Sequence, residues 1–155
     1  MRLARILLFS LLFVSACNSN QNDKKSLAEL RAAPEQVKIA GCLLKLDSEL
    51  WRDAMPPISR ETRPLGGVVK LQTTDGKAFP RNVQVETVFI INGDKVWSAP
   101  VKEIRKAKQD SVLEVVVRNG PDWASATMDV AVLLKDEEGE FHLIRAADQA
   151  IKQVQ

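Results

Sequence analysis

The residues that could carry out chemistry are few and scattered. His142 is the only histidine in the 155-residue chain, and any Ser-His-Asp arrangement would have to pass through it. A blue-copper centre needs two imidazoles and a thiolate, which His142 and Cys42 cannot supply. His142 alternates with Phe141 and Leu143 in a strand-like run, so we expect it to be an outward-facing strand residue. We assign no catalytic, cofactor-binding or metal-ligating residue.

A group of carboxylates is the second candidate for chemistry. Asp136, Glu137, Glu138 and Glu140 are the kind of ligands that Ca²⁺ prefers, but their spacing matches no EF-hand loop. Gly139 among them instead predicts a solvated hairpin turn. A carboxylate pair for glycoside hydrolysis depends on a three-dimensional separation, so a hydrolase stays as an alternative. The motifs for phosphate loops, dinucleotides, zinc proteases and redox cysteines are absent from the sequence.

The three tryptophans are the best candidates for partner binding. Trp51, Trp97 and Trp123 fall in an expected loop, edge strand and turn, where aromatic side chains can contact a protein or a sugar. The alternative is that each one closes an end of a hydrophobic core, because large side chains usually bury most of their area. We expect Trp97 to be the most exposed, because Pro100 marks its strand as an edge strand.

The amino-terminal segment has the layout of a secretory signal peptide. Arg2 and Arg5 precede an apolar run over residues 6–14 that is too short to cross a hydrocarbon core of about 30 Å. The four residues Val14-Ser15-Ala16-Cys17 resemble a bacterial lipobox. This resemblance implies cleavage before Cys17, a diacylglycerol thioether on its sulfur and usually an acylated amino terminus. Two or three acyl chains anchor a protein stably, whereas one is marginal. The alternative is an ordinary signal peptide with an incidental cysteine.

Loss of residues 1–16 changes the charge of the chain. The 22 basic residues minus Arg2 and Arg5 leave 20, against 20 acidic residues, so the net charge falls from +2 to zero. The precursor pI of 8.6 is therefore no evidence for nucleic-acid binding. Cys42 is left without an intramolecular partner; it is a free thiol, an intermolecular bridge or, as we prefer, a buried small hydrophobe.

The residue after the cysteine bears on location. In the enterobacterial lipoproteins that the leader resembles, aspartate at this position signals retention in the inner membrane, whereas this chain has Asn18. The resemblance therefore favours the outer membrane, with the domain facing the periplasm.

The elements that must position these residues are mainly strands. Residues 17–36 are expected to be the lipidated cysteine and a flexible tether, with a short helix after Ser26, which has capping-box spacing to Glu29. Residues 37–155 form the domain. Alternating apolar residues predict seven strands, at residues 37–46, 69–72, 83–91, 95–101, 112–118, 128–135 and 141–144.

Two further local signals refine this pattern. Both faces are apolar from Val88 to Ile91, which places that strand in the centre of a sheet, and Asn92-Gly93 predicts a type I′ hairpin turn. The proline-rich and glycine-rich segment over residues 50–67 is expected to be an irregular crossing.

This pattern predicts an all-β fold, an antiparallel immunoglobulin-like β-sandwich of about seven strands. Over residues 38–146 it resembles immunoglobulin-like or fibronectin-type-III-like domains of bacterial surface proteins, although the inter-sheet cysteine pair and any tyrosine are missing. A small β-barrel is the competing fold.

The expected function is a non-catalytic binding module anchored in the cell envelope through Cys17. Its partner would be an envelope protein or a glycan, and not nucleic acid; the oligomeric state is left open. The alternatives are an envelope hydrolase with a carboxylate pair and an accessory or inhibitor subunit of an envelope complex.

Overall fold

The computed structural model describes residues 24–53 and 63–154. The leader, Cys17 and residues 54–62 of the expected crossing lie outside the described residues. The described elements are α1 (Leu27–Ala32), β1 (Gln36–Ile39), β2 (Cys42–Asp53), β3 (Leu65–Thr73), β4 (Gln84–Asn92), β5 (Lys95–Pro100), β6 (Ile104–Lys106), β7 (Val112–Gly120), β8 (Thr127–Lys135) and β9 (Phe141–Val154). In this part of the chain no helix is long and apolar enough to cross a membrane.

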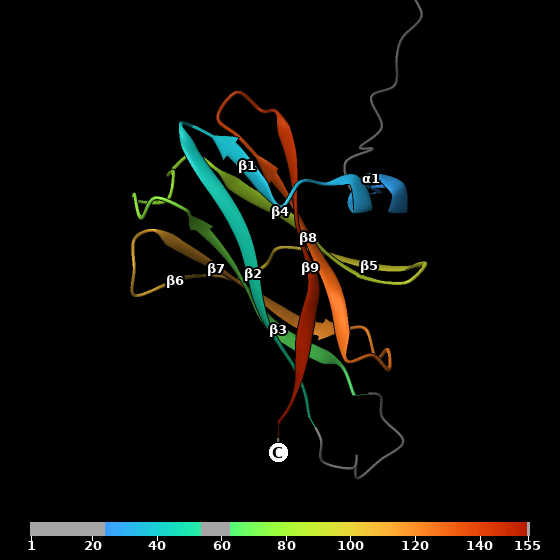
Figure 1. Ribbon diagram of the computed structural model, residues 1–155. Helices are drawn as coiled ribbons and strands as arrows, with labels where there is room; N and C mark the ends of the chain where they lie inside the picture. The colour runs from blue at the N-terminus through green and yellow to red at the C-terminus, as the bar shows by residue number, and fades with distance from the viewer. Residues whose placement is uncertain (1–23, 54–62, 155) are drawn as a thin grey trace, which may run out of the picture.

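The strands form one mixed, curled sheet that resembles half of a barrel (Figure 1). Their order is β5-β4-β8-β9-β2-β3-β7-β6, and β1 pairs with the first part of β2. All pairings are antiparallel except one: Leu50–Asp53 of β2 runs parallel to Ile151–Val154 of β9. The expectation of an all-β fold is confirmed, but the finer prediction is wrong. The described chain has nine strands in a mixed sheet rather than seven in an antiparallel immunoglobulin-like sandwich.

The length of β9 explains this difference. Its first part pairs with β8, and its last four residues pair with β2. Between the two parts Asp148 has a φ of 52°, and the β8 register shifts between Met128 and Val130. Such a bulge bends a strand, so β9 passes from one antiparallel half of the sheet to the other. The polar residues after Ile144 obscure this continuation in the sequence.

Two hairpin turns also differ from the expectation. Residues 37–46 form two strands rather than one, because Ala40 and Gly41 both have positive φ angles, 50° and 75°, as a type I′ turn requires. After β4 the turn residues are Gly93 and Asp94, since Asn92 pairs with Lys95. Only Gly93 of these two has a positive φ, 62°, which is the type II′ pattern rather than the expected type I′.

Strand β2 extends further than expected, to Asp53, and a buried charge lies at its end. Arg52 is 7% exposed and donates a 2.7 Å hydrogen bond from Nη2 to the carbonyl oxygen of Trp123. Asp122 lies 4.0 Å from its Nε. An inward-facing arginine makes this strand end look like a loop in the sequence, and β3 likewise begins at Leu65, inside the expected crossing.

The main core lies on the concave side of the sheet. It combines buried residues from both antiparallel halves, and Leu50, Val69, Val88, Val115, Val132 and Ile144 are examples. Cys42 is a free thiol that packs against this cluster, but it is only half-buried, whereas the preferred interpretation was a buried small hydrophobe.

Helix α1 covers part of the opposite face. The expected capping box is confirmed, because the Ser26 hydroxyl accepts from the Glu29 N–H and the Glu29 carboxylate accepts from the Ser26 N–H. Leu30 is fully buried in a second cluster with Phe89, Ile91, Ala131 and Leu133. Strand β4 is therefore covered on both faces, which confirms its central position.

We expect Leu30→Ala to lower the free energy of unfolding by about 3 kcal/mol, because it removes buried methyl groups and leaves a cavity under a helix too short to be stable alone. Urea denaturation measures this loss. Ala32→Ser, on the exposed side of the same helix, should change stability by less than about 0.5 kcal/mol. Equal effects of the two substitutions would contradict the packing of α1 on the sheet.

Candidate functional site

The two ends of the curled sheet do not pair with each other. β5 is the last strand at one end, and β6 and β7 form the other end. The chain between them, residues 101–103, is tied to both ends. The Val101 N–H donates to the carbonyl oxygen of Glu86 on β4, and the Val116 N–H on β7 donates to the Glu103 carbonyl oxygen. This linker therefore holds the two sheet ends together at one point.

Beyond that point the two sheet ends enclose a hollow of about 250 Å³, which we call the wedge. β6 pairs only with Leu113–Val115 of β7, so the rest of β7 has no strand beside it on this side. The wedge is lined by Val88, Trp97, Ala99, Val115 and Val117 from β4, β5 and β7, and by the linker and Arg118. Drug-sized ligands occupy pockets of about 300–1,000 Å³; the wedge is smaller and has room for one or two side chains.

The outer edge of β5 offers free backbone groups. Asn92 and Lys95 close a two-residue turn, so they form a hydrogen-bonded pair, and bonded and non-bonded pairs then alternate along the hairpin. The N–H and C=O groups of Val96 and Ser98 consequently point away from β4. Pro100, two positions after Ser98, also has its backbone groups on the side away from β4, so its missing N–H removes no sheet hydrogen bond. The prediction that Pro100 marks an edge strand is confirmed.

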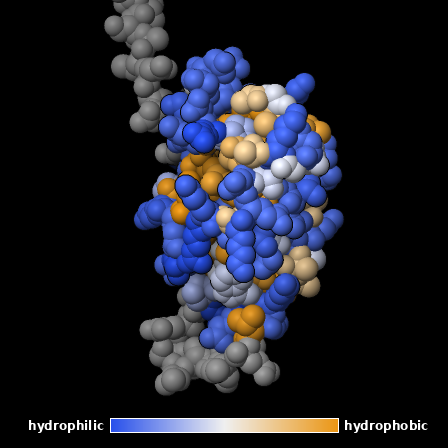
Figure 2. Space-filling model, turned by 90° about the vertical axis from the view of Figure 1, so that its left-hand side faces the viewer, coloured by the Kyte–Doolittle hydropathy of each residue, from blue (hydrophilic) through white to orange (hydrophobic). Residues whose placement is uncertain are grey.

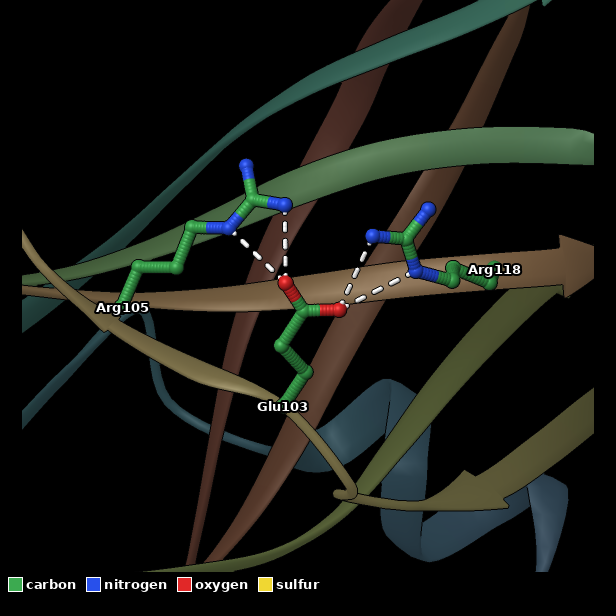
Figure 3. Close-up of polar contacts among 3 residues, drawn as sticks. All are labelled: Glu103, Arg105 and Arg118. Atoms are coloured by element: carbon green, nitrogen blue, oxygen red, sulfur yellow. Dashed lines mark hydrogen bonds and ion pairs between the residues drawn. The ribbon is translucent and has the colours of Figure 1, made fainter.

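A charged cluster lies beside the wedge. Arg105 on β6 and Arg118 on β7 each bind one carboxylate oxygen of Glu103, through Nε and one terminal nitrogen (Figure 3). The remaining nitrogen of each guanidinium points away from Glu103 in this view. These hydrogen bonds lower the pKa of the Glu103 carboxyl below its usual value. The arginine side chains are 51% and 65% exposed, so the cluster presents a net positive charge to solvent.

The surface has no large apolar face in the view of Figure 2, where hydrophilic side chains surround small apolar areas. Large apolar side chains that are exposed in the described chain are Leu43, Val96, Ile104, Phe141 and Val154. Two of these, Val96 and Ile104, belong to the end strands β5 and β6. The exposed apolar groups of the sheet ends thus lie beside backbone edges.

The structure places Trp51 apart from Trp97 and Trp123. Trp97 lines the wedge, and Trp97 and Trp123 are half-buried against the main core. Trp97 is therefore not the freely exposed side chain we expected, although its strand is an edge. Trp51 lies in β2 rather than in a loop, and its side chain is on the face of the sheet opposite to the main core. There its indole covers Gly66, since a Cβ on Gly66 would lie 2.7 Å from the indole Nε1. Trp51 therefore lies on the other face of the sheet from the core against which Trp97 and Trp123 pack.

His142 and the acidic turn form a local cluster. The hairpin turn around Gly139 is confirmed, but His142 does not face outward, because it pairs across the sheet with the buried Leu134 and cross-strand partners share a face. Its Nε2 lies 2.7 Å from Oδ2 of Asp136. One ligand atom each of Asp136, Glu140 and His142 lie within 4.8 Å of one another. Asp136 already bonds His142 and the Glu140 N–H, so this cluster stabilises the turn.

Comparisons with known proteins add no assignment to this geometry. No family model, no curated protein and no solved structure matches the chain.

The His142–Asp136 contact should make stability depend on pH. Its hydrogen bond lowers the pKa of the Asp136 carboxyl, so the stabilisation is complete above the ordinary aspartate value of about 3.9 and is lost as the pH falls through the lowered native value. We expect Asp136→Asn to be less stable than the unaltered protein at pH 5, and the difference to shrink as the pH falls below 4.

Urea midpoints measured across this pH range test the prediction. Glu137→Gln removes a neighbouring carboxylate of the same turn and is the matched control. A difference between Asp136→Asn and the unaltered protein that stayed constant down to the acid transition would contradict the role of this hydrogen bond.

Proposed function

We propose that this chain is a lipid-anchored binding module of the bacterial cell envelope that takes up an extended segment of a partner protein along the edge of β5. The observation that carries the proposal is the unpaired edge of β5 beside the wedge. A sheet edge with free N–H and C=O groups is a template for another strand. Strand addition gains affinity from main-chain hydrogen bonds and specificity from pockets for alternate side chains.

The wedge supplies such a pocket. Trp97, Val88 and Val117 line it with apolar surface, and the next β7 positions have no strand partner on that side. A segment that entered here would extend the sheet from β5 and cover part of the opening of the half-barrel. The structure thus offers both backbone groups and a side-chain pocket at one place.

The lipobox-like leader supports the anchored location. Leu27, the first residue of α1, comes ten positions after Cys17, and a chain of this length spans at most about 35 Å. A lipid on Cys17 would keep the domain close to the membrane surface. Confinement of this kind raises the effective concentration of a partner on the same membrane, so a weak intrinsic affinity suffices. We propose the outer membrane rather than the inner one because Asn18, and not aspartate, follows Cys17.

Ser98 provides the test of strand addition. A photo-crosslinking amino acid at position 98 in intact cells should form an adduct with one envelope protein. The affinity of purified protein for that captured partner should then fall at least about tenfold in Ser98→Pro, because the substitution removes one outward N–H, and about 1.4 kcal/mol corresponds to tenfold. Ser98→Thr keeps the N–H group and should bind normally.

Two results would contradict the proposal. One is an affinity for the captured protein that is the same in Ser98→Pro and Ser98→Thr. The other is crosslinking from the exposed position 45 on β2, with none from position 98. Thermal unfolding of each variant verifies that the fold is kept, since an edge proline breaks no internal sheet hydrogen bond.

The anchor has its own test. We expect Cys17→Ser to move the protein from the membrane fraction to the soluble periplasmic fraction, because no acyl chain can then be attached. Metabolic labelling with palmitate should be lost in the same variant, whereas Cys42→Ser should keep both the label and the location. Membrane association that persisted unchanged in Cys17→Ser would refute lipid anchoring and leave the strand-addition proposal standing.

A further inference from the structure

The charge around the wedge identifies the chemistry of the partner segment, which deepens the proposed function and rests on it. Residues 95–108, from the start of β5 to just beyond β6, contain five basic residues, Lys95, Lys102, Arg105, Lys106 and Lys108, and one acidic residue, Glu103. The segment therefore carries a net charge of +4. Of the charged residues that line the wedge itself, Lys102 and Arg118 are basic and Glu103 is acidic. Arg105 lies next to them on Glu103, which leaves a positive balance beside the wedge.

The basic side chains are available to a partner. Lys102, which lines the wedge, is exposed, and so is Lys95 at the start of β5. Arg105 and Arg118 use one side of their guanidinium groups on Glu103 and keep a further nitrogen turned away from it (Figure 3). Arginine has five N–H donors in a planar fork, so each one can hold a second carboxylate while it keeps the first.

The faces of the strands give the order of side chains in the partner. Trp97 and Ala99 of β5 face the concave side, since they pair with the core residues Ile90 and Val88. Arg118 lies on the other face of β7, one position after the inward Val117. Side chains of an added strand alternate in the same way. Its inward residues would enter the apolar wedge, and its outward residues would lie beside the basic groups.

We propose that the wedge binds an extended protein segment in which apolar residues alternate with aspartate or glutamate. A second copy of this chain is a poor occupant, because two such edges would bring two segments of charge +4 together. The small apolar volume and the free backbone edge favour a peptide strand over a flat anionic surface, which would contact the lysines and leave the wedge empty.

Two short synthetic peptides test this inference on the full chain. One alternates valine with glutamate and the other alternates valine with lysine, and Trp97 fluorescence or NMR shifts of β5 report binding. We expect the glutamate peptide to bind at least about fivefold more tightly at low salt. This preference should disappear in about 1 M salt, where the screening length falls to about 3 Å.

Charge reversal provides the matched variants. Lys102→Glu/Arg118→Glu should reverse the order of the two peptides. Lys38→Glu/Lys45→Glu makes the same change of net charge on β1 and β2, at exposed positions away from the wedge, and should keep the original order. The segment crosslinked from position 98 should also contain alternating acidic residues when it is sequenced by mass spectrometry.

The outcomes separate the two proposals. Equal binding of both peptides that Ser98→Pro abolishes would overturn the acidic partner but keep strand addition. Binding of neither peptide, together with no adduct from position 98, would overturn both. Vesicles of anionic lipid that compete with the glutamate peptide and protect Lys102 and Arg118 equally well would replace the acidic peptide with a membrane surface.

Discussion

The parallel pairing of β2 with the end of β9 is the contact on which the rest of the sheet depends. Four residues of each strand make it, from Leu50 and from Ile151 onward. On one side of it β5, β4, β8 and β9 form an antiparallel group, and on the other side β2, β3, β7 and β6 form another. Leu50 is fully buried and packs in the main core. Without this contact no strand of one group would pair with a strand of the other.

The same arrangement leaves the far ends of the sheet apart. A barrel closes only when strand number, tilt and stagger agree, and here the closing contacts are two hydrogen bonds of the linker, from Val101 and Val116. β7 also bends near its end, where its register against β3 shifts and Asn119 has a φ of 54°. A bulge turns a strand away from its former direction. The wedge lies where the linker ends and this bend begins.

Local signals in the sequence predicted local structure well. The spacing of Ser26 and Glu29 predicted the helix start, because a capping box needs only four neighbouring residues. The doubly apolar run from Val88 to Ile91 predicted the central strand, since both of its faces had to be covered. Pro100 predicted an edge, because its missing N–H is tolerated there.

Such local signals could not predict contacts between segments that are distant in the sequence. Nothing local in Leu50 or Ile151 indicates that they pair, and the buried Arg52 has the polarity of a loop residue because its partner, the carbonyl oxygen of Trp123, is remote in sequence. Ala40 in a left-handed turn was missed for a different reason: alanine rarely adopts positive φ. At the candidate site, the sequence predicted the edge but not the wedge, which needs the β7 bend and the linker. The sequence also did not show that the Trp97 side chain faces the core, because this depends on the pairing of Trp97 with Ile90 across β4 and β5.

The free edges raise the question of how the protein avoids pairing with itself. Exposed edges are commonly protected by charge, by proline and by short strands, and all three occur here: Lys95 and Pro100 bound β5, and β6 has three residues. These devices act unequally on different partners. Positive charge repels a second copy of the same edge but attracts a strand that carries carboxylates, and Pro100 blocks one N–H while Val96 and Ser98 keep theirs. Protection against self-association and selection of an acidic partner can therefore arise from the same residues, and neither requires a catalytic group.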